Sequence, residues 1–435
     1  MPELKKSLGV WSAAAISIGA IIGAGIFVLV GVASGLAGPS VILSFALAGC
    51  VALFTALSAA ELSSFITEAG GSFIFTTRAF GKVWGFVVGW MQSADYIIGA
   101  SAVAIGFAGY LLYFVGLPAG TTALIVIGCL LPIVLMILNL VGIREAAGAN
   151  SILVLLKIGA LLLFVAIGGL YLFAHGSSGN YQPFFPTGIS GTLHGAAVIF
   201  FAFVGFNTVT VIAEEVKDPE KNVPRALMIA FVVSTILYLS VSVVAIGLSD
   251  WQLLSNSTAP LETALRTATQ NQFVLKYVSI AAIFATASVV LSSIFGASRA
   301  LFAMSRQKTL PGWLSVISKR GVPLHAVLFV GIIASAIILV ARGNLDALAQ
   351  IFNFGTLTTY FFINLSLIKL RWDHPQIERP FRVPFYPVTP VLGIISCALL
   401  LAFLSRYAMV FGLIWLAIGI FLYERQLRHI GGPAK

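Results

Sequence analysis

Charged side chains are scarce in this chain. Asp, Glu, Lys and Arg make up 9% of its 435 residues, whereas hydrophobic residues make up 59%. A soluble domain carries about 25% charged residues, so this composition excludes a soluble globular protein and predicts a polytopic helical membrane protein. The first apolar segment has no small-residue cleavage site behind a short apolar core, and we expect a retained helix rather than a signal peptide.

Cysteine and histidine are also rare, with three and five residues respectively. Cys50, Cys129 and Cys397 stand singly in apolar segments, and His175 and His194 show no metal-ligand spacing. The sequence therefore predicts no disulfide framework, no metal site and no cofactor. Phosphate loops and nucleophile–base motifs are missing as well, so we expect a protein that is not an enzyme.

The excess of basic residues, 25 against 15 acidic ones, follows a membrane pattern. If the N-terminus is inside, the outer segments hold only Arg266, Lys276, Arg342 and Arg406, and Lys157 lies within a helix. This distribution predicts a multi-pass protein of the cytoplasmic (inner) membrane with both termini cytoplasmic, surrounded by lipid and without a nucleic-acid partner. Twelve membrane helices are predicted near residues 10–35, 39–66, 83–115, 121–143, 149–174, 193–214, 225–249, 273–303, 324–341, 346–369, 387–404 and 408–424.

Two of these segments, the first and the sixth, are interrupted by glycine. The interruptions fall at Gly23–Gly25 and at Gly205, five segments apart. Interrupted helices at matching positions of two halves indicate the binding site of a secondary transporter, and an odd number of spans per half makes the second half inverted. We therefore predict repeats at 1–174 and 175–370, with the last two helices and the tail at 371–435. Close helix packing is the alternative explanation for the glycines.

Two ionisable residues lie deep in apolar segments. A lysine at the centre of a membrane helix costs about 2.5–3.5 kcal/mol, so Lys157 should face the bundle interior. There it could take up and release a proton, or remain a permanently charged lysine held by helix carbonyls. Asp95 could titrate, attract a cationic substrate side chain, or pair with polar neighbours. The residues leave these alternatives open.

Two further acidic residues, Glu61 and Glu68, lie near the inner end of the second segment. We expect them to belong to an inner gate or to pair with Arg78 and Lys82. In either role they lie away from the interrupted helices.

Three stretches identify a resemblance to a known family. They are IGAIIGAGIF at 18–27, FFAFVGFNTVTVIAEEVKDPEKNVPRA at 200–226 and SIFGASRALFAMSRQKTLPGW at 293–313. Together they resemble the amino acid–polyamine–organocation superfamily of permeases, and the second is similar to the cationic amino acid transporters and their prokaryotic relatives. The resemblance spans the first ten segments. It implies a leucine-transporter-type fold: all-α, with a 5+5 inverted repeat and helices 1 and 6 broken around one substrate.

The resemblance also implies a set of substrate-binding residues. Amides of helix 1 would bind the substrate α-carboxylate, and carbonyls of helix 6 would bind its α-ammonium. The amides fall on Ile21, Ala24 and Gly25. The carbonyls fall on Phe201, Ala202 and Val204. An aromatic lid falls on one of Phe201, Phe203 or Phe206. Helix-end dipoles favour the same arrangement, because amides face an anion and carbonyls a cation.

Proton coupling is implied in the same way. Some proton-coupled members of the family carry a lysine on helix 5 where sodium-coupled relatives bind an ion, and Lys157 matches that position. By analogy, its ammonium would bridge carbonyls near Gly19 or Ala20 and the hydroxyls of Thr286 and Ser288. The proton would then be the coupling ion.

The predicted function is secondary active transport of L-amino acids by alternating access, as proton symport. The alternative within transport is an exchanger of amino acids, or of amino acid against polyamine, without proton coupling. An intramembrane enzyme and an ion channel are the alternatives from other classes. A pocket of Phe, Val, Ile and Ala favours neutral substrates; Asp95 could accept a cationic one, while Asn207 stands where cationic-type relatives often have Asp. Which amino acid is carried and the oligomeric state stay open.

Overall fold

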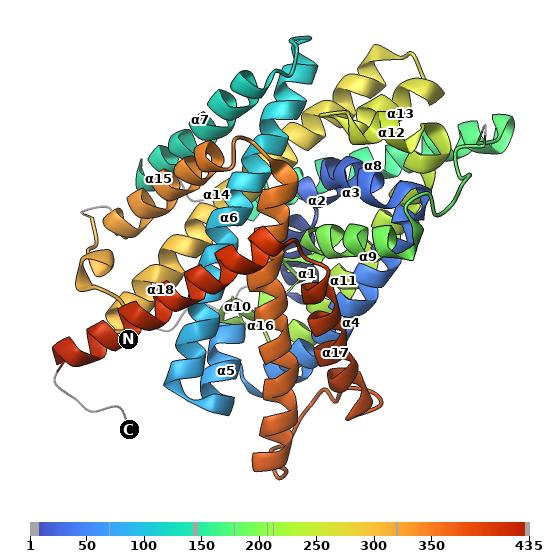
Figure 1. The fold of residues 1–435 in the computed structure, drawn as a ribbon. Coiled ribbons are helices and arrows are strands. Elements are labelled where there is room, and N and C mark those ends of the chain that lie inside the picture. Colours follow the sequence, from blue (N-terminus) through green and yellow to red (C-terminus); the bar gives the residue numbers. More distant parts are fainter. Residues whose placement is uncertain are drawn as a thin grey trace.

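The computed structural model describes residues 8–68, 70–141, 147–177, 179–206, 208–211, 213–318 and 321–430, and all regular elements in these ranges are helices (Figure 1). The first half contains α1 (Val10–Ile21), α2 (Ala24–Phe27), α3 (Leu29–Ala37), η1 (Gly38–Ser40), α4 (Val41–Phe65), α5 (Ser72–Phe80), α6 (Lys82–Phe114), α7 (Thr121–Val141) and α8 (Ala147–His175). The second half begins with α9 (Gly188–Ile199), η2 (Phe200–Phe203), α10 (Thr208–Val211), η3 (Ala213–Glu215), α11 (Pro219–Leu248), α12 (Trp251–Ser255) and α13 (Pro260–Ala268). It ends with α14 (Gln272–Arg306), η4 (Gly312–Ser315), α15 (Leu324–Val340), α16 (Leu345–Asp373), α17 (Val388–Ala402) and α18 (Arg406–Ile430).

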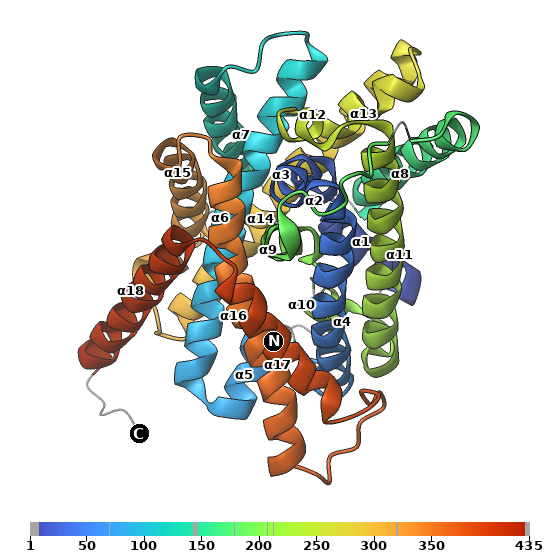
Figure 2. The same ribbon diagram turned by 45° about the vertical axis from the view of Figure 1, so that its right-hand side comes forward.

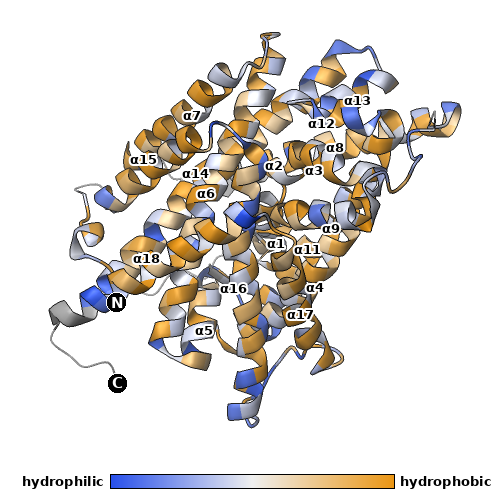
Figure 3. Ribbon diagram, in the orientation of Figure 1, coloured by the Kyte–Doolittle hydropathy of each residue, from blue (hydrophilic) through white to orange (hydrophobic). Residues whose placement is uncertain are grey.

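The long helices of the described residues could cross a membrane, judged by length and composition. Within the described ranges, 9 helical stretches are long and apolar enough to cross a bilayer, and α1, α15 and α17 are shorter apolar helices. Hydrophobic residues cover most of the helix surfaces, and hydrophilic residues gather toward the ends, as on α13 and at the end of α16 (Figure 3). These findings confirm an all-α polytopic membrane protein. Twelve crossings, and repeats at 1–174 and 175–370 with a remainder at 371–435, stay predictions.

The long helices pack in a bundle around α6. Helix α6 contacts α14 and α16, α4 contacts α11, and α1 packs against α8 and α11. The short helices α12 and α13 lie at one end of the bundle, whereas α5 and the last turns of α16 lie at the opposite end (Figure 2). We call the first end the outer side and the second the inner side, following the orientation that the basic residues predict.

Two of the short helices, α12 and α13, lie between the predicted membrane segments 225–249 and 273–303, where no helix is predicted. The Asp250 side chain caps α12 by accepting a hydrogen bond from the Gln252 amide at 2.6 Å. Pro260 opens α13, a position that favours proline, and Glu262 and Arg266 stand four residues apart on it. Local capping and charge pairing therefore stabilise two short helices outside the predicted apolar segments.

Candidate substrate and coupling site

The first interruption separates α1 from α2. Helix α1 ends at Ile21, Ile22 adopts an extended backbone, and α2 begins at Ala24. Only Val28, itself in a helical conformation, separates α2 from α3. The first amides of a helix have no acceptor within it, and the last carbonyls have no donor. The break therefore presents carbonyls at the end of α1 and amides at the start of α2, where the glycines predict an interruption.

The second interruption follows η2. Val204 is extended, and Gly205 has a φ of +113°, which side-chain-bearing residues rarely adopt. A Cβ on Gly205 would lie 2.9 Å from the carbonyl carbon and oxygen of Ala20. Position 205 therefore requires glycine for two reasons, the positive φ of the turn and the close approach of α1. Helix η2 ends at Phe203, and the Val204 amide donates to the Phe201 carbonyl at 3.3 Å, so the last carbonyls of η2 lie at a helix end.

The two interruptions lie against each other. A Cβ built on Gly25 would lie 2.4 Å from the Ala202 Cα, so the α2 and η2 backbones are in direct contact. The Ser17 hydroxyl donates to the Phe206 carbonyl at 3.3 Å, and the Tyr238 hydroxyl donates to the Ile21 carbonyl at 2.8 Å. The structure therefore brings together the residues predicted to bind substrate. Tyr238, on α11, is an addition that the sequence pattern did not indicate.

Of the three predicted lid residues, Phe201 and Phe206 contact aromatic rings of α16. The ring of Phe201 packs on Phe352 with centroids 4.2 Å apart. Phe203 and Phe206 are almost fully buried and pack among aromatic rings of α11 and α16. Phe201, at 8% exposed, is the least buried of the three, and Phe352 is its partner. A lid role for any of them stays a prediction. Nothing in the sequence distinguishes Phe352 from the other aromatic residues of its segment.

Lys157 projects from α8 to the end of α1. It is 2% exposed, and its Nζ donates to the Gly19 carbonyl at 3.0 Å. A helix C-terminus carries unpaired carbonyls and partial negative charge, so this position stabilises an ammonium. The hydroxyls of Thr286 and Ser288 donate to carbonyls of their own helix, α14. Their contact with Lys157 stays a prediction.

Asp95 lies on the face of α6 that packs against α16 and α18. Its Oδ2 accepts a hydrogen bond from the Thr356 hydroxyl at 3.1 Å. The carboxyl lines a cavity of about 10 Å³ between α6, α16 and α18, which is room for about one water molecule. Gly355 makes space for it, because a Cβ there would lie 2.0 Å from Oδ1. None of these contacts involves α2 or η2; Asn207 lies outside the described residues.

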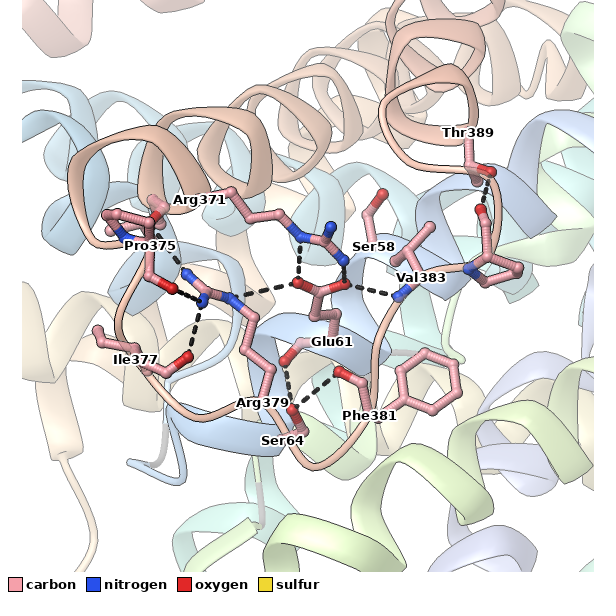
Figure 4. Close-up of polar contacts among 12 residues, drawn as sticks. Ser58, Glu61, Ser64, Arg371, Pro375, Ile377, Arg379, Phe381, Val383 and Thr389 are labelled. Atoms are coloured by element: carbon pink, nitrogen blue, oxygen red, sulfur yellow. Dashed lines mark hydrogen bonds and ion pairs between the residues drawn. The ribbon is translucent and has the colours of Figure 1, made fainter.

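A buried carboxylate network lies at the inner side. Glu61 on α4 is fully buried, and Arg371 Nε and Nη2 donate to its two oxygens at 2.6 and 2.5 Å (Figure 4). The Val383 amide donates to the same carboxylate at 2.6 Å, and Arg379 Nε lies 3.4 Å from it. The network ties α4 to α16 and to the segment leading into α17.

The other acidic residue of this region has a local partner. Glu68 pairs with Arg78, one of the two partners that the sequence suggests, and both side chains are exposed. Glu61 instead finds its partners more than 300 residues away. The inner end of α4 therefore combines one solvated ion pair with one buried network.

Sequence comparison identifies the family. A family profile described as amino acid permease matches residues 8–422. The chain belongs to the amino acid permease family. The match places it in the amino acid–polyamine–organocation superfamily, so this permease is a transporter, not an enzyme.

Individual relatives cover nearly the whole permease. It is 36% identical to the branched-chain amino acid permease BcaP of Bacillus subtilis, over 98% of this chain and 94% of the relative. It is 34% identical to the methylthioribose transporter of the same organism, with the same coverage. It is 33% identical to the vacuolar cationic amino acid transporter 2 of Arabidopsis thaliana, over 87% of this chain and 61% of the relative. These relatives are named for different substrates.

Proposed function

We propose that this permease is a proton-coupled symporter of neutral L-amino acids that works by alternating access in the cytoplasmic membrane. Similarity to a permease named for branched-chain amino acids supports a neutral substrate. The apolar character of the residues around the two interruptions supports it too, because a cationic side chain buried there would need a partner. Asp95, the acidic residue considered for that role, faces α16 and α18 instead.

A zwitterion fits the polarity of the two interruptions. In this proposal, the amides at Ile21, Ala24 and Gly25 bind the substrate carboxylate. Ala24 and Gly25 lie at the positive end of α2, and Ile21 is the last residue of α1, across the break from them. The carbonyls at the end of η2 bind the ammonium. The direct contact between α2 and η2 supports recognition of both charges by one small molecule. Phe201 then closes over the substrate against Phe352.

The observation that carries the proposed coupling is the hydrogen bond from Lys157 to the Gly19 carbonyl. Charge-assisted hydrogen bonds are about twice as strong as neutral ones. A protonated Lys157 therefore holds α8 against the end of α1, and loss of the proton weakens that tie. Because Gly19 and the substrate-binding residue Ile21 lie on the same turn of α1, protonation and substrate binding act on one element.

Gradient-driven uptake tests this proposal. Proteoliposomes are loaded with buffer and given labelled L-leucine, with or without an inward proton gradient. With an inward gradient of one pH unit and no membrane potential, we expect accumulation to rise up to about tenfold, which is the equilibrium ratio for one proton carried with each substrate. Lys157→Arg should abolish this accumulation but retain leucine exchange, because arginine keeps the charge and cannot release its proton.

One control variant and one alternative outcome complete the test. Lys276→Met replaces an exposed lysine at the outer part of α14 and should behave as wild type. If the gradient changes nothing in wild type while internal leucine accelerates uptake, the permease is an exchanger and Lys157 is structural.

A further inference from the structure

The outer helices α12 and α13 form a cap on the helices that carry the proposed site. Helix α12 rests on α3 at Gly31 and Gly35, where a Cβ would lie 2.7 Å from the Leu254 carbonyl and 2.9 Å from the Ser255 side chain. The residues between α12 and α13 rest on α6, since a Cβ on Gly109 would lie 3.0 Å from Thr258. The cap thus covers the outer end of the broken first helix (Figure 2).

A buried carboxyl lies on the inward face of this cap. Glu262, on α13, is 4% exposed. One of its oxygens accepts a hydrogen bond from Arg266 at 3.1 Å, and the other accepts from the Ser279 hydroxyl of α14. Arg266 in turn donates to the Tyr113 hydroxyl of α6 at 2.7 Å. Glu262 therefore joins the cap to both α14 and α6.

The surroundings of Glu262 hold few other charges. Lys276 on α14 and Asp250 before α12 are exposed. The outer half of α11, residues 234–248, contains no charged residue, and the outer half of α8 contains only His175, whose ring bonds the Tyr171 carbonyl. Among the described residues, Arg266 is the one that forms an ion pair with Glu262.

This environment makes the Glu262 carboxylate bind a proton more tightly than an exposed carboxylate does. Burial raises the pKa of Glu262 to about 7, although the positive charge of Arg266 opposes the rise. The Ser279 hydroxyl can accept from a neutral carboxyl as readily as it donates to a carboxylate. If the cap lifts and water reaches the carboxyl, its pKa returns toward the ordinary value of 4.5. A proton therefore binds more tightly when the cap rests on α6 and α14, which we call the seated state.

The cap also contacts the substrate-binding helix through α6. The Tyr110 hydroxyl donates to the carbonyl of Phe27, the last residue of α2, at 2.7 Å. The same hydroxyl faces the backbone of Leu261, the neighbour of Glu262 on α13. Seating of α13 and positioning of α2 thus share one hydrogen-bonded side chain.

We propose that Glu262 is a second proton-binding site of this permease, on its outer side, which takes up a proton as the α12–α13 cap seats on α6 and α14. The seated cap binds the proton more tightly than the open one. The seated state therefore becomes more stable relative to the open state as pH falls from about 7 to 4.5, and this stabilisation is lost as pH rises through 7. The inference rests on the proposed alternating-access function only where it concerns transport; seating itself requires no substrate.

The first test measures cap seating without substrate. Spin labels are placed at Leu253→Cys on α12 and Leu117→Cys beyond α6, both exposed positions, after the native cysteines are replaced. In nanodiscs, we expect the seated-to-open ratio to change up to about tenfold per pH unit between 7 and 4.5. Glu262→Gln, which keeps the shape without a charge, should remain seated at every pH.

Glu68→Gln, at the exposed ion pair on the inner side, is the matched control and should keep the wild-type response. A wild-type distance that does not change between pH 8 and 5 would overturn the proposal, as would a pH response that persists in Glu262→Gln.

The second test measures leucine counterflow with equal pH on both sides, so that no gradient contributes. The test uses the Lys157→Arg background, which is expected to retain exchange and in which position 157 does not titrate. We expect the rate in this background to fall as pH rises from 5.5 to 8, and to be flat when Glu262→Gln is added. A slope retained when Glu262→Gln is added would overturn the role in transport. If no leucine exchange occurs in any variant, the proposed function fails, while the distance measurement still decides whether Glu262 binds the proton.

Discussion

Replacing Glu61 by alanine is expected to lower the free energy of unfolding by about 3–5 kcal/mol. The change leaves the guanidinium groups of Arg371 and Arg379 at the buried inner network without the carboxylate that both contact. It also leaves the Val383 amide without its acceptor. Thermal unfolding in detergent should show the midpoint falling by about 5 °C.

The exposed pair on the same side provides the control. Glu68→Ala removes the partner of Arg78, but both side chains are about half exposed, so we expect a loss of about 0–1 kcal/mol. A triple variant with Glu61→Leu, Arg371→Met and Arg379→Met should recover much of the loss, because apolar side chains can replace a buried ionic cluster. Equal losses for Glu61→Ala and Glu68→Ala would show that the network does not hold the inner ends of α4 and α16 together.

A single methyl group on Gly25 should abolish substrate binding. In Gly25→Ala, the new Cβ would lie 2.4 Å from the Ala202 Cα and 2.5 Å from its Cβ, closer than any van der Waals contact. The α2 and η2 backbones must separate, and displacements of about 1 Å in a site can cost about 100-fold in function. We expect at least that loss in leucine affinity, measured by binding of labelled leucine to purified protein.

Gly169→Ala is the matched comparison, because nothing lies within 4 Å of its Cβ on α8. This variant should bind leucine as wild type does, and both variants should elute as a single species in gel filtration. Wild-type affinity in Gly25→Ala would mean that the contact between the two interruptions does not define the site.

The sequence predicts the centre of this molecule better than its ends. Glycine within an apolar segment weakens the helix at that position, and the breaks at Gly23 and Gly205 lie where the sequence predicts them. Lys157 is equally visible, because a lysine within a membrane helix requires an acceptor, and the Gly19 carbonyl is among those that the resemblance implies. Roles in substrate binding and coupling stay predictions for all of these residues.

The contacts that sequence reasoning missed are those between distant segments. Glu61 has basic residues nearby in sequence, yet its partner Arg371 comes from α16. Tyr238 and Phe352 approach the site from α11 and α16, and their own segments carry no sign of it. The helix α13 had a usable signal in Pro260 followed by an acidic and a basic residue four apart. The other contacts depend on how distant helices pack together, which the sequence of each segment alone does not reveal.

The central claim is that the two interruptions together recognise both charges of an amino acid. The most direct measurement is competition against labelled L-leucine by three compounds of similar size: leucine itself, 3-methylbutylamine, which lacks the carboxylate, and 4-methylpentanoate, which lacks the ammonium. Each hydrogen bond to a charged group contributes about 1.5–3 kcal/mol, so loss of either charge should weaken competition by at least about 10-fold. Leucine alone should compete efficiently. Equal competition by the amine or the carboxylate would contradict the account, because one of the two helix ends would then contribute nothing to binding.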